Sequence, residues 1–240
     1  MEFTLKNISK SYGKLQVLNS LSLEIEENSI IAFLGPSGCG KTTLLSLIAG
    51  LNQPDDGEIL GLENKSISYL FQEPRLLDWL TVADNLSFVL TDQIAGDEIK
   101  HRIDYYLKHM EILEYRNAYP RRLSGGQRQR VAMARALAYP SRILLMDEPF
   151  KSLDLGLKLE LIHRLLLLWT AEPRTIILVT HDTKEALLLA DEIFVLSEKP
   201  TVIKSHHRIS IPKQKRKTAD LSLLHLEQTI INELINNETY

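Results

Sequence analysis

Cysteine is nearly absent from this chain, because Cys39 is the one example among 240 residues. A single thiol excludes an intramolecular disulfide and is typical of proteins from reducing compartments. No stretch reaches the ~18 apolar residues that a membrane-spanning helix needs, so none is predicted. Met1–Lys6 also has no apolar segment of the kind found in signal peptides. If the protein works at a membrane, we expect it to dock onto another polypeptide.

Neither sign of charge dominates the sequence. Lys and Arg number 28 and Asp and Glu 31, for a net charge of −3. This balance gives no electrostatic reason to expect a nucleic-acid partner. Hydrophobic residues make up 44% and charged residues 25%, which indicates a globular protein with a substantial core in one or two domains.

One glycine-rich stretch matches G-x-x-x-x-G-K-[ST], the loop that wraps the phosphates of a nucleotide. It consists of Gly35, Pro36, Ser37, Gly38, Cys39, Gly40, Lys41, Thr42 and Thr43. Glycine allows successive backbone N–H groups to face an anion. Lys41 can reach the outer phosphates, and the Thr42 hydroxyl can bind Mg²⁺. Ser29–Leu34 before the loop reads as a buried strand, and 42–49 after it reads as a helix, which is the context the motif requires.

Polar side chains follow other apolar stretches that read as buried strands. Gln72 follows the predicted strand 66–71, and His181 follows the predicted strand 174–180. Asp147 and Glu148 end the strand that starts at Arg142. Carboxyl ends of parallel strands meet at the ligand edge of an α/β sheet, so these side chains are expected to converge. There Asp147 could hold Mg²⁺, and Glu148 could accept a proton from water or orient it. The plainer alternatives are a charged helix cap and a structural histidine.

The segment between these strands has helical patterns. Residues 81–84 fit a capping box, and 99–113 are amphipathic, so 73–140 is expected to form a helical subdomain inserted in an α/β core. The N-terminal part alternates as strands, with a turn expected at Ser11-Tyr12-Gly13. Within 73–80 the large apolar residues are either core or a docking patch for a partner. These are Leu76, Leu77, Trp79 and Leu80.

The C-terminal part is predicted to contain a helix over 157–169 and short strands over 193–196 and 202–204. A basic run, 213–217, is expected to be a solvated linker, with weak attraction to anionic lipid as the alternative. A final helix is predicted from apolar spacing. The residues that indicate it are Leu221, Leu224, Ile230, Leu234 and Ile235.

A second glycine-containing stretch begins at Leu123 and comprises Ser124, Gly125, Gly126 and Gln127. At a helix start, a serine hydroxyl and exposed backbone N–H groups form another phosphate-binding surface. This stretch, followed by 128–137, resembles the signature sequence of the ATP-binding cassette (ABC) ATPases. Together with the phosphate loop it is close to diagnostic of that family.

The resemblance implies an α/β fold: a P-loop NTPase (RecA-like) core with an N-terminal antiparallel β region and an inserted α-helical subdomain. It covers roughly 1–205, which we expect to be the ABC ATPase domain, with 206–240 as a C-terminal basic linker and helix. By position, six further residues are similar to functional residues of the family. Tyr12 resembles the adenine-stacking aromatic, Gln72 the Q-loop glutamine, Asp147 with Glu148 the Walker B pair, Asp154 the D-loop aspartate and His181 the switch histidine.

The same resemblance implies ATP and Mg²⁺ as cofactors, with the metal held by Thr42, Gln72 and Asp147. Two copies would face head to tail as a homodimer, each ATP lying between the phosphate loop of one and Ser124–Gln127 of the other. Glu148, assisted by Gln72 and His181, would be catalytic. Expected partners are transmembrane permease subunits and, indirectly, an extracytoplasmic solute-binding protein, with the chain peripheral on the cytoplasmic face of the cell membrane.

A narrower resemblance is to the nitrate/sulfonate/taurine importer ATPases, which include bicarbonate and thiamine-precursor systems, through Phe71–Val82 and 179–191. The chain departs from that group at Asp78, usually proline, and at Lys151-Ser152, usually Gly-Ala. We expect Lys151 to be solvated beside the dimer interface.

Two alternatives remain open. A soluble P-loop enzyme would leave Leu123–Gln127 without a purpose. A non-transport ABC ATPase usually carries coiled-coil insertions or tandem cassettes, which this sequence does not have.

Overall fold

The computed structural model describes residues 1–151, 153–217 and 220–235. Its strands form two sheets. The first is antiparallel, with the order β2 (Leu15–Ile25), β1 (Phe3–Tyr12), β4 (Asp56–Leu60). The second has the order β5 (Ile67–Leu70), β6 (Ile143–Asp147), β7 (Thr175–Thr180), β3 (Ile30–Leu34), β8 (Glu192–Leu196), β9 (Ile203–Arg208). Neighbours in this sheet run parallel except β9, which is antiparallel to β8.

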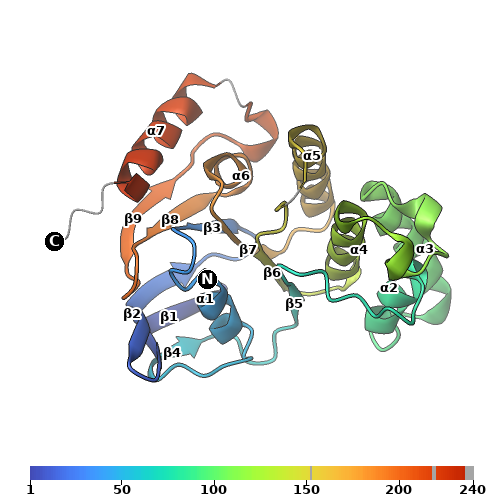
Figure 1. Cartoon of the computed structure of the whole chain (residues 1–240), viewed down its shortest axis with the longest axis horizontal. Helices are drawn as coiled ribbons and strands as arrows, with labels where there is room; N and C mark the ends of the chain where they lie inside the picture. Colours follow the sequence, from blue (N-terminus) through green and yellow to red (C-terminus); the bar gives the residue numbers. More distant parts are fainter. Residues whose placement is uncertain (152, 218–219, 236–240) are drawn as a thin grey trace.

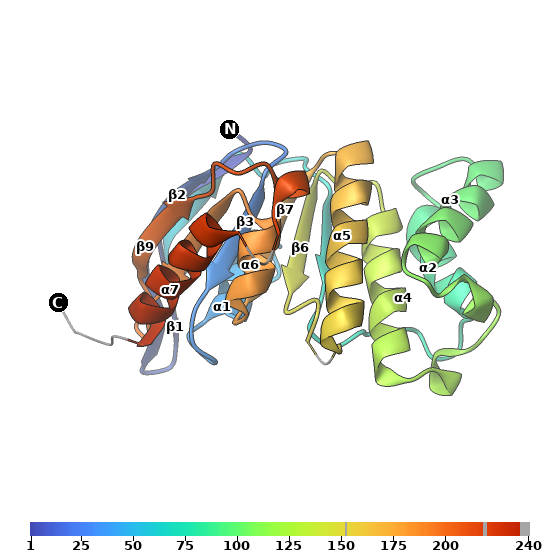
Figure 2. The ribbon, with the colours of Figure 1, turned by 90° about the horizontal axis from the view of Figure 1, so that it is seen from above.

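Helices cover both faces of the second sheet (Figures 1 and 2). They are α1 (Lys41–Ile48), α2 (Val82–Leu90), α3 (Gly96–His109), α4 (Gly125–Ala138), α5 (Leu155–Ala171), α6 (Thr183–Leu189) and α7 (Leu221–Ile235). Short 3₁₀ turns occur at Leu113–Tyr115, Pro120–Arg122 and Lys213–Lys215. In the described ranges, none of these helices combines the length and apolarity that crossing a bilayer requires. The α/β class and the antiparallel N-terminal sheet agree with the expected fold.

Strand β3 contributes to two separate hydrophobic cores because its side chains alternate between the two faces of the sheet. Ile31 and Phe33 pack with α1 and the antiparallel sheet. Ala32 and Leu34 pack on the opposite face, against the larger helical core. Every residue of β3 is buried, as is typical of a central parallel strand. The phosphate loop therefore leaves the sheet from a fully buried inner strand.

Helices α2, α3 and α4 lie together at one end of the molecule, beyond α5 (Figures 1 and 2). The chain enters this group after β5 and returns to the sheet at β6. The capping box predicted at 81–84 is present in part, because the Thr81 hydroxyl accepts a hydrogen bond from Asp84 N at 3.2 Å. In the loop before α2, Leu76 packs against the core, whereas Trp79 is 69% exposed. The apolar segment 73–80 is thus divided between core and surface.

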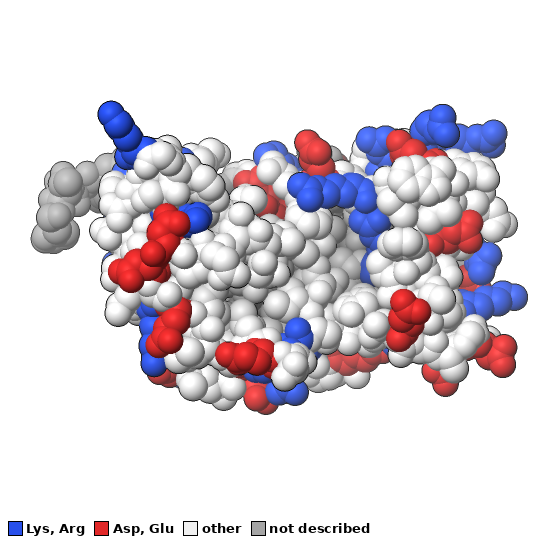
Figure 3. All heavy atoms as spheres, turned by 90° about the horizontal axis from the view of Figure 1, so that it is seen from below, with Lys and Arg blue, Asp and Glu red and all other residues white. Residues whose placement is uncertain are grey.

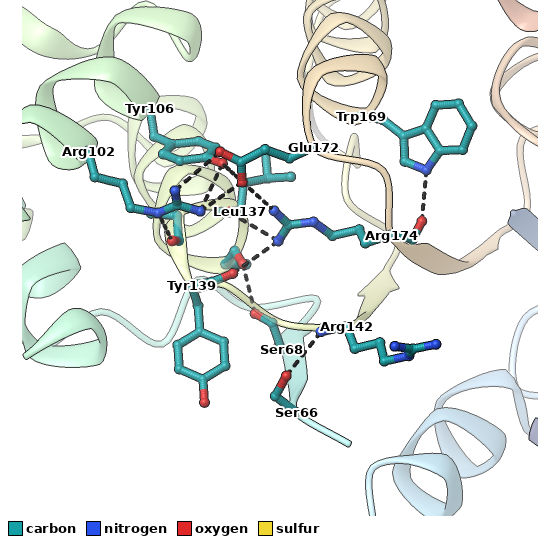
Figure 4. A network of polar contacts seen from close by, with 12 residues as sticks. Ser66, Ser68, Arg102, Tyr106, Leu137, Tyr139, Arg142, Trp169, Glu172 and Arg174 are labelled. Atoms are coloured by element: carbon teal, nitrogen blue, oxygen red, sulfur yellow. Dashed lines mark hydrogen bonds and ion pairs between the residues drawn. The ribbon is translucent and has the colours of Figure 1, made fainter. Parts of the chain in front are cut away.

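One carboxylate joins this helical group to the rest of the fold (Figure 4). Glu172, which follows α5, accepts hydrogen bonds from the Arg102 guanidinium at 2.9 and 3.2 Å and from the Tyr106 hydroxyl at 3.0 Å. Arg174 bonds to the same carboxylate at 3.0 Å. Arg102 Nε also donates to the carbonyl of Ala138 at the end of α4. Charge-assisted bonds of this kind fix α3, α4 and α5 relative to one another.

The C-terminal segment is part of the core, which differs from the expected linker. Strand β9 runs across the boundary expected at 205/206 and pairs with β8. The prediction of a solvated basic linker is wrong for two of its residues. Lys213 is buried on Asp191, with Nζ–Oδ distances of 2.5 and 2.6 Å, and Arg216 is buried with bonds to the carbonyls of Leu187 and Ala190. The cause is tertiary, since each cation finds its partners at the end of α6.

Helix α7 is present where predicted, and two of the residues that indicate it, Ile230 and Leu234, pack in or against the core. Leu223 and Ile230 are buried in the helical core, whereas Leu221 is 75% exposed and Ile235 is 70% exposed. The buried residues are seven apart, which places them on one face of the helix. The end of the predicted C-terminal segment, 236–240, lies outside the described residues.

On the face drawn in Figure 3, basic and acidic side chains lie mainly around the edge, with a broad uncharged area between them. This face therefore presents no single sign of charge over the described residues.

Candidate functional site

The phosphate loop leaves β3 and turns into α1 through backbone conformations that glycine adopts readily. Gly38 has φ +77° and Gly40 φ +119°. A Cβ at Gly40 would lie 2.7 Å from Val17 Cγ1, so the loop also packs closely against β2. The N-terminus of α1 is left without a side-chain cap. These free N–H groups and the positive end of the helix form a site that suits a phosphate.

Lys41 and Cys39 both point into the loop. Lys41 is buried, and its Nζ donates to the carbonyls of Gly35 at 2.7 Å and Pro36 at 2.9 Å. Cys39 is buried, and burial raises the pKa of its thiol. A thiol with a raised pKa is a poor nucleophile, which agrees with a packing role for Cys39.

The phosphate loop is connected to β6 by a direct hydrogen bond. The Thr42 hydroxyl donates to Asp147 Oδ2 at 2.8 Å. Burial raises the pKa of Asp147, the Thr42 hydrogen bond lowers it, and the neighbouring Glu148 charge raises it again, so that the pKa lies above its ordinary value. A hydroxyl and a carboxylate side by side are oxygen ligands that suit Mg²⁺.

Glu148 holds an unusual backbone conformation at the end of β6. Its φ is +45°, in the left-handed region that non-glycine residues rarely adopt. Its N–H donates to the carbonyl of Val179 in β7 at 2.9 Å, which ties the strained residue to the sheet. Strain of this kind is concentrated at functional sites and is maintained by surrounding structure.

Three side chains converge on the Glu148 carboxylate. His181 Nδ1 lies 3.2 Å from Oε1, while Lys151 Nζ lies 2.8 Å and Gln72 Nε2 3.4 Å from Oε2. Lys151 is exposed, as predicted, but its ammonium is also paired with Glu148, which the sequence did not indicate. Partial burial raises the pKa of Glu148, but the hydrogen bonds with Lys151 and His181 outweigh it and hold the pKa below its ordinary value.

The sheet order explains why these residues meet. β5, β6 and β7 are neighbours and parallel, and Gln72, Asp147 and His181 follow their carboxyl ends. β3 lies next to β7, so the phosphate loop opens at the same edge. His181 is followed by Asp182, whose side chain caps α6 by accepting from two backbone N–H groups.

A cavity of about 440 Å³ lies at this edge. Its lining includes six predicted residues of the loop and its helix (Ser37, Gly38, Gly40, Lys41, Thr42 and Thr43), and also Tyr12, Gln72, Asp147 and Glu148. The sequence interpretation did not identify Leu15, Val17 or Lys199, which also line it, and it assigned Lys151 no place there. Lys199 lies in the connection between β8 and β9, where no motif or periodic pattern indicates that it lines the cavity.

Tyr12 is the last residue of β1, not part of the predicted turn, which falls at Gly13. Its ring is half exposed beside the cavity, and Lys10 Nζ lies 5.7 Å from the ring centroid. An exposed aromatic ring at this position is available for stacking on a planar base.

The second glycine-containing stretch lies apart from this cavity, because Ser124–Gln127 are not among the described residues that line it. Ser124 caps α4 in a reciprocal capping box: its hydroxyl accepts from Gln127 N at 3.3 Å, and its N–H donates to Gln127 Oε1 at 2.8 Å. Ser124 and Gly125 are exposed, while Gly126 and Gln127 are half-buried. Asp154 likewise caps α5, accepting from Leu157 N at 3.0 Å. Ser152, noted as a departure from the importer group, lies outside the described residues.

Comparisons with known proteins agree with this geometry. A family model described as ABC transporter matches residues 18–151. The chain is 38% identical over 236 residues to an aliphatic sulfonates import ATP-binding protein of Mesorhizobium japonicum, covering 97% of this chain and 88% of that protein. It is 42% identical over 207 residues to a sulfate/thiosulfate import ATP-binding protein of Mesostigma viride. That match covers 82% of this chain but 60% of the relative's length.

Solved structures of ATP-binding cassettes have the same fold as this chain. A dimeric bacterial ABC transporter cassette superposes with a TM-score of 0.78 at 29% identity, over 88% of this chain and all of the other. A dimeric post-hydrolysis state of an ATP-binding cassette bound to ADP and Pi superposes with the same TM-score and identity over the same share of each chain.

Proposed function

This chain belongs to the ABC transporter family, and on that premise we propose that it is the ATP-hydrolysing subunit of an importer for a small solute. The observation that carries the proposal is the convergence of Gln72, Lys151 and His181 on Glu148. Glu148 lines the same cavity as the phosphate loop. A site for nucleotide binding alone would not need an oriented carboxylate beside the phosphate loop.

The binding part of the site is assigned to the phosphate loop. Backbone N–H groups of Gly38 and Gly40 and the uncapped start of α1 hold the phosphates, with the Lys41 ammonium among them. Tyr12 provides an aromatic surface for the adenine ring. The full set of proposed nucleotide contacts in one chain is Tyr12, Gly35, Pro36, Ser37, Gly38, Cys39, Gly40, Lys41, Thr42 and Thr43.

The Thr42–Asp147 pair fits Mg²⁺, with Gln72 at the same edge as a third oxygen donor. When bound, the metal would neutralise charge on the phosphates of ATP during phosphoryl transfer. Glu148 orients the attacking water and accepts its proton. Its pKa below the ordinary range keeps this carboxylate ionised near neutral pH. His181 lies 3.2 Å from Oε1 of that carboxylate and would contact a terminal phosphate oxygen.

The arrangement supports a head-to-tail pair of copies. Ser124–Gln127 form a second anion-binding helix start, yet they are not among the described residues lining the cavity of their own chain. A second copy would bring its Ser124, Gly125, Gly126 and Gln127, with Asp154 nearby, to complete the site. The dimeric cassettes among the structural neighbours support this assembly.

We further propose that the chain works on the cytoplasmic face of the cell membrane by docking onto permease subunits, and indirectly serves a solute-binding protein. The exposed Trp79 and Phe88 on the helical group are suited to contact an apolar partner, since they are 69% and 67% exposed. The solute is assigned to the sulfonate class, because the sulfonate relative matches along nearly the whole of both chains.

Reconstitution with the permease tests this proposal. The chain, its permease and the solute-binding protein are placed in liposomes, and ATP-driven uptake of an aliphatic sulfonate is measured against sulfate and nitrate. We expect sulfonate uptake, and its loss with Glu148→Gln. Uptake of sulfate or nitrate in preference would reassign the solute, whereas ATP hydrolysis without co-purification of any membrane protein would count against transport.

A further inference from the structure

The turn that follows Glu148 is fixed from inside the protein. Lys151 N–H donates to the carbonyl of Glu148 at 3.2 Å, which closes the turn. Phe150 at its centre is fully buried in the helical core, and Gln129 Nε2 donates to the carbonyl of Pro149 at 3.0 Å. The backbone of Lys151 is therefore held in one place relative to Glu148, and its side chain reaches back without a loop having to move.

Among the three side chains around the Glu148 carboxylate, Lys151 makes the shortest contact. Its Nζ–Oε2 distance is 2.8 Å, against 3.4 Å for the neutral amide of Gln72 at the same oxygen. An ammonium–carboxylate bond at this distance is charge-assisted, whereas an amide contact at 3.4 Å is weak. The orientation of Oε2 thus depends mainly on Lys151, and Oε1 is left facing His181 at 3.2 Å.

The position of Lys151 also decides between two roles. It lines the cavity together with Lys41, so it could in principle be a second cation for phosphates. Its ammonium, however, is committed to Oε2, and the Glu148 side chain that it contacts is only 12% exposed. A nearly buried carboxylate that takes part in chemistry needs a fixed orientation more than the loop needs another charge.

We propose that Lys151 is a positioning residue for hydrolysis: its ammonium holds Glu148 Oε2, so that the carboxylate stays in the cavity with Oε1 toward His181. This inference rests on the proposed ATPase function and adds to it a residue that orients the catalytic carboxylate. Lys151 acts through Glu148 and does not itself contact the reacting atoms.

The test compares Lys151→Met, Lys151→Arg and, as a control, Lys100→Met, which changes an exposed lysine on α3. The kcat and KM for ATP are measured by steady-state hydrolysis, and the Kd by titration with a fluorescent ATP analogue. We expect Lys151→Met to lower kcat about tenfold while KM and Kd stay within about twofold, because misplacing a reacting group costs rate more than affinity. Lys151→Arg restores most of the rate, and Lys100→Met leaves all three constants unchanged.

Two further measurements separate positioning from other roles. In a Glu148→Gln background, Lys151→Met should have no additional effect on the residual rate. A crystal structure of Lys151→Met should show the Glu148 carboxylate displaced from His181, a result that does not depend on turnover.

An unchanged or increased kcat in Lys151→Met would overturn the inference, as would a Kd that rises more than kcat falls, since that identifies a phosphate contact. If the unaltered protein does not hydrolyse ATP, the proposed function fails instead. The crystal structure then decides this inference alone, which is lost if Glu148 keeps its orientation without Lys151.

Discussion

The Thr42 hydroxyl donates a hydrogen bond to Asp147 Oδ2 at 2.8 Å, although 105 positions separate the two residues in the sequence. This bond joins the first turn of α1 to the end of β6. It brings together the two protein oxygens that are best placed for Mg²⁺ at this sheet edge. Asp147 has its pKa raised chiefly by burial, as expected for a carboxylate that is shielded from water until a cation compensates it.

Asp147→Asn should uncouple nucleotide binding from magnesium. The amide keeps the shape and can still accept from Thr42, but it removes the charge that attracts the cation. Outer-shell partners alone are worth roughly 10–100-fold in metal affinity, so we expect the Mg²⁺-dependent gain in ATP affinity to fall at least about tenfold. Titrations of the protein with ATP, with and without Mg²⁺, measure this gain in affinity. Ser46→Ala, a change in the same helix at a residue that does not line the cavity, serves as the control. An Asp147→Asn protein with the full magnesium effect would remove Asp147 as a ligand.

A composite site predicts complementation between two inactive proteins. Lys41→Ala removes the loop lysine, and Ser124→Arg blocks the second helix start, so each homodimer should have almost no turnover. In an equal mixture, half of the dimers contain one intact site, and about a quarter of the original activity should return. Hydrolysis is measured before and after mixing, at concentrations where dimers form. Failure to recover activity in mixed dimers whose composition is verified would show that the two groups do not serve one site.

Much of the site could be predicted because its signals are local. The phosphate loop requires a fixed series of residue types, and strand ends in a parallel sheet must meet at one edge, which is why Gln72, Asp147 and His181 were expected together. The contact of Lys151 with Glu148 could not be predicted in this way. It depends on the left-handed φ of Glu148 and on the buried Phe150, and neither has a sequence signal.

The remaining errors have a common physical cause. A run of cations normally remains solvated, and only tertiary partners distant in sequence reverse that preference for Lys213 and Arg216. Likewise, Leu221 and Ile235 of the predicted α7 face are exposed, because spacing identifies an amphipathic helix but not the surface that receives it. Lys199 reaches the cavity through a connection between strands, where no periodic pattern applies.

Because of Glu172, the free energy of unfolding should fall at acidic pH. Partial burial raises its pKa, but hydrogen bonds and charges from Arg102, Tyr106 and Arg174 lower it below the ordinary value of 4.5 in the folded state. The unfolded state therefore binds this proton more readily, so the stabilisation is present above about pH 5 and is lost as pH falls through the folded pKa. Glu172→Gln should lower the unfolding free energy at pH 7 by about 1 kcal/mol, since the carboxylate is partly exposed.

Urea unfolding of the unaltered protein and Glu172→Gln checks this at pH 7 and at about pH 3.5, which is about one unit below the ordinary pKa of glutamate. The difference in unfolding free energy between the two proteins should shrink in acid. Glu114→Gln, at an exposed position, should show no such change. A deficit in Glu172→Gln that is as large in acid as at neutral pH would mean that packing, not charge, accounts for the effect.

The burial of Lys213 leads to a prediction for the C-terminal segment. Its ammonium lies 4.0 Å from the centroid of the Trp169 ring and is paired with Asp191, whose Oδ2 also accepts from Ile30 N at 2.8 Å. Lys213→Met removes the charge but keeps the stem, leaving Asp191 without its ion-pair partner beside β3. We expect a loss of about 2 kcal/mol in unfolding free energy, less than for a fully buried pair because Asp191 is partly exposed. Lys215→Met, in the same run but exposed, should cost almost nothing.

The double variant Lys213→Met with Asp191→Asn makes this prediction specific to the ion pair. An asparagine can still accept from Ile30 N but leaves no uncompensated charge, so the double variant should recover part of the loss. Denaturant unfolding of the four proteins gives the coupling between the two residues. If the two single losses simply add, the pair contributes nothing, and Lys213 is held by the Trp169 ring and by packing of its methylene stem.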